Sequence, residues 1–86
     1  IENAYTLSDG EYEVIEAEII ETSELINKEI KNSNLPDELR IGAVLRDEKI
    51  IIPRSNFVFK KDDRVVFIVK KESIPFVENI FRLSSI

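Results

Sequence analysis

The sequence contains no cysteine, no histidine and no methionine, and each absence excludes something. Without cysteine or histidine there are no thiol nucleophiles, no disulfides, no zinc site of the ordinary type and no imidazole general base. Small secreted domains usually depend on disulfides, so their absence favours a reducing, intracellular setting. Because the chain lacks methionine and begins at Ile1 in ordinary polar sequence, we expect it to be a piece of a longer protein.

Glycine and long apolar runs are also scarce in this chain of 86 residues. Its two glycines, Gly10 and Gly42, are too few for a glycine-rich phosphate-binding loop. No apolar run approaches the roughly 18–20 residues of a membrane span, and no signal peptide opens the chain. A chain this short forms one modest core and has no room for separate cofactor and catalytic domains. We therefore expect a cytoplasmic domain that is not an enzyme and does not insert into a membrane.

The charge of the chain is negative overall and unevenly distributed. The formal net charge is −5; residues 1–43 carry 3 basic and 11 acidic side chains, whereas residues 44–86 carry 9 and 6. Nucleic-acid binding needs a basic surface to neutralise phosphates, so we expect no nucleic-acid partner. The asymmetry either steers two copies or two faces towards each other, or reflects elements whose solvent faces differ in charge.

The N-terminal half predicts a strand followed by a short helix. Residues 1–9 are expected to be a linker or lead-in from a preceding domain, and residues 10–86 the domain itself. Residues 11–20 alternate between apolar and polar side chains, as a half-buried strand does. The apolar face of this strand consists of Ile15, Ala17 and Ile19. Ser23 offers an oxygen to cap a helix, which the apolar spacing extends over residues 23–32.

The C-terminal half predicts further strands and a second helix. Strands are expected at Arg40–Arg46, residues 49–52 and Arg64–Lys70, with a short extended piece at residues 57–59. Ser73 and Pro75 indicate the start of a last helix. Its apolar stripe consists of Phe76, Val77, Ile80, Phe81 and Leu83. The fold class is thus α+β: a small sheet of four or five mostly antiparallel strands with two helices packed on it.

Polar candidates for chemistry are few. Asp62 and Asp63 are adjacent, so on extended backbone they point to opposite faces and fit a turn better than a paired-carboxylate site. The glutamates Glu16, Glu18 and Glu21 are candidates for holding a hard cation on the strand surface, but one strand supplies fewer oxygens than a calcium ion needs. Arg46 and Arg54 flank the predicted strand at residues 49–52, where they are candidates for binding an anion.

The strand Arg40–Arg46 has an unusual glycine near its middle. Glycine weakens a strand and often marks the close approach of another backbone or of a ligand. At Gly42 this indicates either a helix resting on the sheet or a contact with a ligand or a second subunit. Regular alternation places Ile41, Ala43 and Leu45 on one face, which we expect to form the contact of a two-fold dimer.

Several stretches, in their order and spacing, resemble the C-terminal ligand-binding domain of the regulators of potassium conductance, most closely that of Trk-type potassium-uptake regulatory proteins. They are Leu35-Pro36 and residues 41–46, 51–53, 63–67 and 77–81, so that the resemblance spans residues 10–84. Two turns depart from the family, which often has Gly-Lys at Asn27-Lys28 and Gly-Asp at Asp62-Asp63. Asn and Asp tolerate positive φ, so both turns are expected to survive.

The resemblance implies a function and partners. Such domains follow a Rossmann domain, which binds a nucleotide of NAD or ATP type, in a cytosolic protein that assembles on a membrane potassium transporter or channel. They form homodimers through their sheets, and some bind cyclic di-AMP or an ion at the dimer interface; no other cofactor or metal is expected here. The corresponding ligand-binding positions are Leu35, Pro36, Arg40, Ile41, Gly42 and Ala43.

Two alternatives remain open beside a regulatory, ligand-binding domain of a potassium-uptake system. The domain is either purely structural, serving only dimerisation, or the equivalent cytosolic domain of an ion antiporter or anion transporter. Ligand titration separates the first alternative from regulation, and the sequence of the parent protein separates the second.

Overall fold

The structure, a computed structural model, describes residues 3–7 and 10–81. Within these residues the chain forms five strands, two short 3-10 helices and one α-helix. The elements are β1 (Asn3–Leu7), β2 (Tyr12–Glu18), η1 (Ile30–Asn32), β3 (Arg40–Arg46), β4 (Lys49–Ile51), β5 (Arg64–Lys70), η2 (Lys71–Ser73) and α1 (Ile74–Phe81). The α+β class is therefore confirmed, as are the bounds predicted for β3 and β5.

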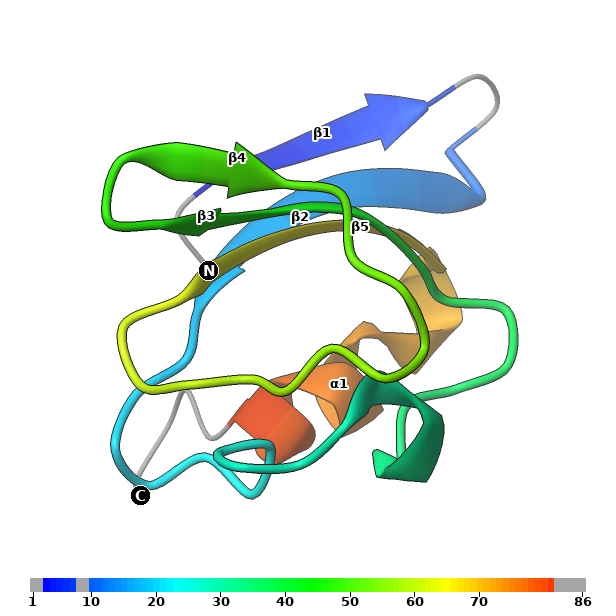
Figure 1. Cartoon of the computed structure of the whole chain (residues 1–86). Helices are drawn as coiled ribbons and strands as arrows, with labels where there is room; N and C mark the ends of the chain where they lie inside the picture. Colours follow the sequence, from blue (N-terminus) through cyan, green and yellow to red (C-terminus); the bar gives the residue numbers. More distant parts are fainter. Residues whose placement is uncertain (1–2, 8–9, 82–86) are drawn as a thin grey trace.

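The strands form one antiparallel sheet in the order β1-β2-β5-β3-β4. The sheet is curved, and α1 and the irregular segments lie on its concave side (Figure 1). Strand β5 is central and pairs with β2 and β3 over most of its length. Its alternation is that of a strand with one covered face: Val65, Phe67 and Val69 are buried, while Ile68 is 41% exposed.

The core lies between the concave face of the sheet and α1. Ile15, Ala17 and Ile19 are buried, as their alternation predicts. The rings of Phe67 on β5 and Phe81 on α1 stack with centroids 5.3 Å apart, which joins the sheet to the helix. The predicted apolar stripe of this helix is confirmed in part: Val77 and Ile80 are also buried, but Phe76 is 49% exposed, and Leu83 lies outside the described residues.

The helix predicted over residues 23–32 is wrong. Most of this segment consists of turns, followed by the three residues of η1, so that α1 is the single α-helix of the described residues. The backbone of the segment predicted to be helical pairs instead with residues 55–59. The Asn27 amide donates to the Phe59 carbonyl (2.8 Å), and the Ile30 amide donates to the Phe57 carbonyl (3.0 Å). Asn27 has φ of 66°, which interrupts any helix. Tertiary hydrogen bonds thus override the local apolar spacing.

Ser23 still makes the side-chain bond that its helix-capping role predicts. Its Oγ accepts a hydrogen bond from the Leu25 amide (3.1 Å) and donates one to the Ile80 carbonyl of α1 (3.0 Å). The capping residue therefore connects the turn to the distant helix. At the other predicted cap, the Ser73 hydroxyl donates to Glu38 (2.9 Å) and not to the helix backbone.

Two local predictions near the sheet edges need correction. Asn3–Leu7, expected to be a linker, forms strand β1, which pairs with β2 from Asn3↔Glu16 to Leu7↔Tyr12. The regular alternation of β3 is also wrong, because a bulge lies between Ile41 and Ala43. The extra residue, Gly42, changes which face the following side chains occupy.

The turns predicted to tolerate positive φ do so. Asn27 has φ of 66° and Asp62 φ of 75°, at the two positions where the resembling family often has glycine. The β3–β4 connection has φ of 52° at Asp47 and 65° at Glu48, as a two-residue type I′ hairpin requires. Polar residues that accept left-handed backbone therefore replace glycine in this glycine-poor chain.

Candidate functional site

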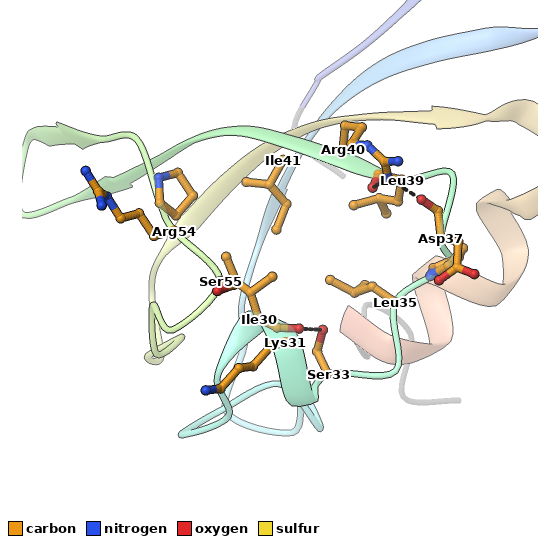
Figure 2. A pocket seen from close by; sticks show the side chains of 12 residues that line it. Ile30, Lys31, Ser33, Leu35, Asp37, Leu39, Arg40, Ile41, Arg54 and Ser55 are labelled. Atoms are coloured by element: carbon orange, nitrogen blue, oxygen red, sulfur yellow. Dashed lines mark hydrogen bonds between the residues drawn. The ribbon is translucent and has the colours of Figure 1, made fainter.

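A cavity of about 440 Å³ opens where the start of β3 meets two loop segments. One segment contains η1 and the loop that leads to β3; the other follows β4. The cavity is lined by Ile30, Lys31, Ser33, Leu35, Pro36, Asp37, Leu39, Arg40, Ile41, Pro53, Arg54 and Ser55. Figure 2 shows these side chains from close by.

The inner wall of the cavity is apolar and its rim is charged. The side chains of Ile30, Leu35 and Ile41 point towards one another across it, while Lys31 and Arg54 extend outwards (Figure 2). Ile30, Leu35 and Ile41 also pack against the buried core, so they are fixed from behind. Such a wall suits a flat apolar group. Three cations, Lys31, Arg40 and Arg54, line the cavity against one carboxylate, Asp37, and this excess suits an anion attached to that group.

Arg40 is positioned by the loop that precedes β3. Its Nη1 donates hydrogen bonds to the carbonyl oxygens of Asp37 and Leu39, the latter at 3.0 Å. The Leu39 amide donates to the Pro36 carbonyl (3.1 Å), which closes the turn beneath the guanidinium. The turn between residues 36 and 39 therefore shapes the loop, and the carbonyl oxygens of the loop hold the Arg40 guanidinium (Figure 2).

The opposite wall is held together by backbone and hydroxyl bonds. The Lys31 amide donates to the Ser55 carbonyl (2.9 Å), and the Ser33 hydroxyl donates to the Ile30 carbonyl (2.7 Å). The first bond fastens η1 to the segment that follows β4. The two loops of the cavity are thus joined to each other as well as to the sheet.

The cavity contains four of the six ligand-binding positions that the sequence predicts. Leu35, Pro36, Arg40 and Ile41 line it, whereas Gly42 and Ala43 do not. Gly42 is exposed, and a Cβ added there would lie 3.7 Å from the Val66 carbonyl, an ordinary contact. The interpretation of this glycine as a place where a helix rests on the sheet is therefore wrong.

The three predicted interface residues do not share one face of the sheet. Ile41 pairs with buried Phe67, so it faces the core and the cavity, and Leu45 and Ala43 lie on the outer face. The bulge at Gly42 separates them, because one inserted residue reverses the alternation. A dimer contact across the outer face would use Ala43 and Leu45 without Ile41.

Sequence reasoning missed several lining residues, among them Ile30, Lys31 and Ser55. The helix expected over residues 23–32 hid them, because a helix there would not bring Lys31 against Ser55. Arg54 was identified as a candidate for binding an anion, and it does line the cavity. Asn27 could have revealed the missed lining residues. A residue that tolerates positive φ, at a position where the family often has glycine, predicts a turn and not a helix.

A second polar centre joins Arg46 to Asp63. Asp63 is 1% exposed and accepts hydrogen bonds from Arg46 Nε (2.8 Å), Arg46 Nη2 (2.7 Å) and the Lys60 amide (2.9 Å). Arg46 also donates to the Val58 carbonyl (2.9 Å) and lies 4.7 Å from the centre of the Phe57 ring. These contacts hold Arg46 within the fold, and of the two candidates for binding an anion only Arg54 lines the cavity.

The Asp63 hydrogen bond raises the pKa of the Arg46 guanidinium, with the nearby negative charges adding to it against the effect of burial. A raised pKa stabilises the folded state below the ordinary pKa of arginine, and this stabilisation is lost only as pH rises above that value. Arg46 therefore stays protonated, and the ion pair stays intact on its side, at every pH below the ordinary pKa of arginine. Asp62 has φ of 75° and the Asp63 amide donates to the Lys60 carbonyl (3.2 Å), so this pair of aspartates belongs to a turn, as predicted.

Within residues 3–7 and 10–81 no group of three or more acidic residues is placed to hold a metal ion. No helix among these residues has the length and apolar character needed to cross a membrane.

Comparison with known proteins identifies the family. Residues 14–82 match the TrkA-C domain. The chain belongs to the TrkA-C domain family. It is 38% identical over 84 residues to the Trk system potassium uptake protein TrkA of Azorhizobium caulinodans, covering 98% of this chain and 18% of that protein. A second relative, the Trk system potassium uptake protein TrkA of Vibrio alginolyticus, is 35% identical over 88 residues. The match covers 98% of this chain and 19% of that protein. The chain thus spans about a fifth of the length of the curated relatives that it matches.

Solved structures share the fold of this TrkA-C domain. The RCK_C domain dimer of S. agalactiae BusR in complex with c-di-AMP superposes with a TM-score of 0.72 at 23% identity, over 83% of this chain and 97% of that one. The expected resemblance is confirmed. TrkA-C is a regulatory, non-catalytic domain family, and this membership confirms the prediction that the domain is not an enzyme.

Proposed function

We propose that this TrkA-C domain regulates potassium uptake by binding a ligand in the cavity of Figure 2 within a homodimer. The parent protein would be a cytoplasmic subunit that works at the inner face of the membrane on a Trk-type transporter, with a nucleotide-binding Rossmann domain before this one. Membership of the TrkA-C family and similarity to TrkA proteins support this proposal. The observation that carries it is the cavity itself, which combines an apolar wall with cations at the rim.

The ligand we propose is cyclic di-AMP. Its adenine rings would pack on Ile30, Leu35 and Ile41, and its phosphates would lie near Arg40 and the other rim cations. The BusR neighbour is a dimer in complex with c-di-AMP, which supports the same chemistry. A two-fold symmetric ligand would use one such cavity from each protomer, so occupancy and dimer arrangement would be linked.

Regulation would follow from that linkage. A ligand that binds one dimer arrangement better than another shifts the balance between them, typically by about 1–3 kcal/mol. The domains attached to the two protomers would then change their relative positions, because each is joined to a protomer whose place in the dimer depends on the ligand.

Isothermal titration of the 86-residue chain with cyclic di-AMP, beside AMP and ATP, tests the proposal. We expect saturable heat with cyclic di-AMP, lost in Ile41→Glu, which places a charge in the apolar wall. Arg40→Ala should weaken binding by about 10–100-fold, the usual effect of removing a charged hydrogen-bond donor. Arg64→Ala is the matched control, because Arg64 lies on β5 and bonds Glu16 (3.3 Å) outside the cavity.

Two results would contradict the proposal. Absence of both heat and thermal shift across the nucleotides would leave a purely structural dimerisation domain. Equal losses in the Arg40 and Arg64 variants would show that binding depends on general surface charge and not on the cavity.

A further inference from the structure

The outer face of the sheet, opposite α1, carries apolar side chains on four neighbouring strands. Ile68 on central β5 is 41% exposed and Ile50 on β4 is 72% exposed. No helix of the described residues covers this face, because α1 lies on the concave side of the sheet (Figure 1). A contiguous exposed apolar surface of this kind usually marks an interaction site. We call it the outer band, and its large side chains are Tyr12, Val14, Val66, Ile68, Leu45 and Ile50.

The register of the sheet makes this band run diagonally across the strands. Val14 on β2 lies opposite Ile68 on β5, and Ala43 on β3 lies opposite Val66, one step further along the face. The last step brings Leu45 beside β4. With strands about 4.8 Å apart and about 3.3 Å per residue along each strand, the band is about 25 Å long, the length of a helix of about 16 residues.

The bulge on β3 places the two smallest residues of the face at the middle of the band. Ala43 pairs with Val66, and Gly42 is the inserted residue beside it. Apart from its chain neighbours, a Cβ added at Gly42 would meet only the Val66 carbonyl (3.7 Å), so the space above this glycine is open. Such a place allows another backbone to approach closely. The backbone that would fill it does not come from the described part of this chain.

Opposite charges border the two long sides of the band. On one side Glu16 and Glu18 occupy outer positions of β2, and Arg64 bonds Glu16 (3.3 Å), so carboxylates outnumber cations there. On the other side lie Lys70 and Arg40, at the ends of β5 and β3, and no outer position of these two strands holds a carboxylate. The outer band is therefore acidic along one side and basic along the other.

We propose that the outer band is the docking surface for an amphipathic α-helix of a partner protein. The helix has one apolar stripe, cationic side chains along the side that faces Glu16 and Glu18, and anionic side chains along the side that faces Lys70 and Arg40. Charge also fixes the direction in which the helix runs, because a reversed helix would bring like charges together.

A second copy of this chain fits the outer band less well than a helix does. The band lies on the convex side of the sheet, so two such faces would touch only near their centres (Figure 1). A helix instead follows the band over its length and reaches the open space above Gly42. The inference does not use the cavity of Figure 2, so its failure and the failure of the proposed function are separate results.

Two designed peptides test the charge pattern on the 86-residue chain. Both are helical, about 16 residues long, and share one stripe of leucine and alanine and the same numbers of lysine and glutamate. The segregated peptide carries its lysines on one side of the stripe and its glutamates on the other, whereas the mixed peptide carries both on each side. The segregated peptide should bind saturably and about 10-fold more tightly than the mixed one. In nuclear magnetic resonance its binding should shift the amides of Val14, Val66 and Ile68 and leave that of Val77 unchanged.

Substitutions locate the binding surface. Ile68→Lys should weaken binding of the segregated peptide by about 10–100-fold, because it places a charge in the band. Phe76→Lys is the matched control and should bind as the wild-type chain does, because Phe76 is also exposed (49%) but lies on α1. Glu18→Lys makes both sides of the band basic and should shift the preference to a third peptide that carries glutamate on both sides.

Three results would overturn the proposal. They are absence of saturable binding, equal binding of the segregated and mixed peptides, and equal losses in the Ile68 and Phe76 variants. Shifts of the same amides with chain concentration alone would assign the band to a second copy and would also overturn it. The comparison of the two peptides uses the wild-type chain, so the result does not depend on the folding of any variant.

Discussion

Asp63 is predicted to be the single most important polar side chain for the stability of this TrkA-C domain. Its carboxylate is 1% exposed and accepts three hydrogen bonds, two from Arg46 and one from the Lys60 amide. Asp63→Ala removes the acceptor for all three and leaves the guanidinium beside an apolar gap. The substitution therefore acts on a charge and on a turn at the same time.

The magnitude follows from burial. Removing one partner of a buried ion pair typically costs about 3–5 kcal/mol. The Arg46 side chain is 26% exposed, so water takes over part of its solvation, and we expect about 3 kcal/mol for Asp63→Ala. In a domain of 60–100 residues 1 kcal/mol corresponds to about 4–8 °C, so the midpoint of thermal unfolding should fall by about 12–24 °C.

Urea unfolding followed by circular dichroism at neutral pH measures this effect. Asp63→Asn and Asp62→Asn form a matched pair, because Asp62 is exposed and its bond with Lys61 (3.3 Å) is a surface ion pair of little worth. The first should cost roughly 2 kcal/mol and the second almost nothing. A double-mutant cycle of Asp63→Ala with Arg46→Met should show coupling of at least about 1 kcal/mol. Additive effects, or equal effects of the two asparagine variants, would refute the assignment of the stability to this ion pair.

Further predictions concern a turn, a buried hydroxyl and the bulge. Asp62→Val should cost about 1–2 kcal/mol in urea unfolding, because Asp62 has φ of 75° and a β-branched residue resists that conformation, whereas Asp62→Gly should be neutral or stabilising. Ser23→Ala should cost about 1–3 kcal/mol, because it leaves the Leu25 amide and the Ile80 carbonyl without their buried partner; an unchanged midpoint would show that water replaces the hydroxyl. Gly42→Arg should fold, because the position is exposed and not crowded. If the outer face of β3 forms a dimer contact, this variant should be monomeric in light scattering. A variant that stays dimeric would show that the contact lies elsewhere.

Strands β2 and β5 were predictable from the sequence because their pattern is local, whereas β1 was not, since residues 1–9 were expected to be a linker. Alternating apolar residues on β2 and β5 define their buried faces without knowledge of any partner, and the positive-φ turn residues mark where the chain reverses. The core contribution of α1 follows in the same way from its helical spacing.

The cavity was predictable only in part because it depends on contacts between distant segments. Residues 27–31 leave the helical conformation to pair with residues 55–59, a choice that the local spacing of Leu25, Ile26 and Ile30 opposes. The bulge on β3 was equally hidden, since it is defined by the register against β5 and not by β3 itself. Arg40 and Ile41 were still identified, because the family resemblance supplies what periodicity does not.

The bulge at Gly42 lets β3 place two side chains on the same face that a regular strand would place on opposite faces. Val44 is needed in the core and Ile41 in the cavity wall, yet their odd spacing would send them to opposite sides of an ideal β-ribbon. A one-residue deletion at this point would turn Ile41 towards water and expel it from the cavity wall, while the rest of the sheet kept its pairing. Length at residue 42, more than the identity of the side chain there, is what the domain has to preserve.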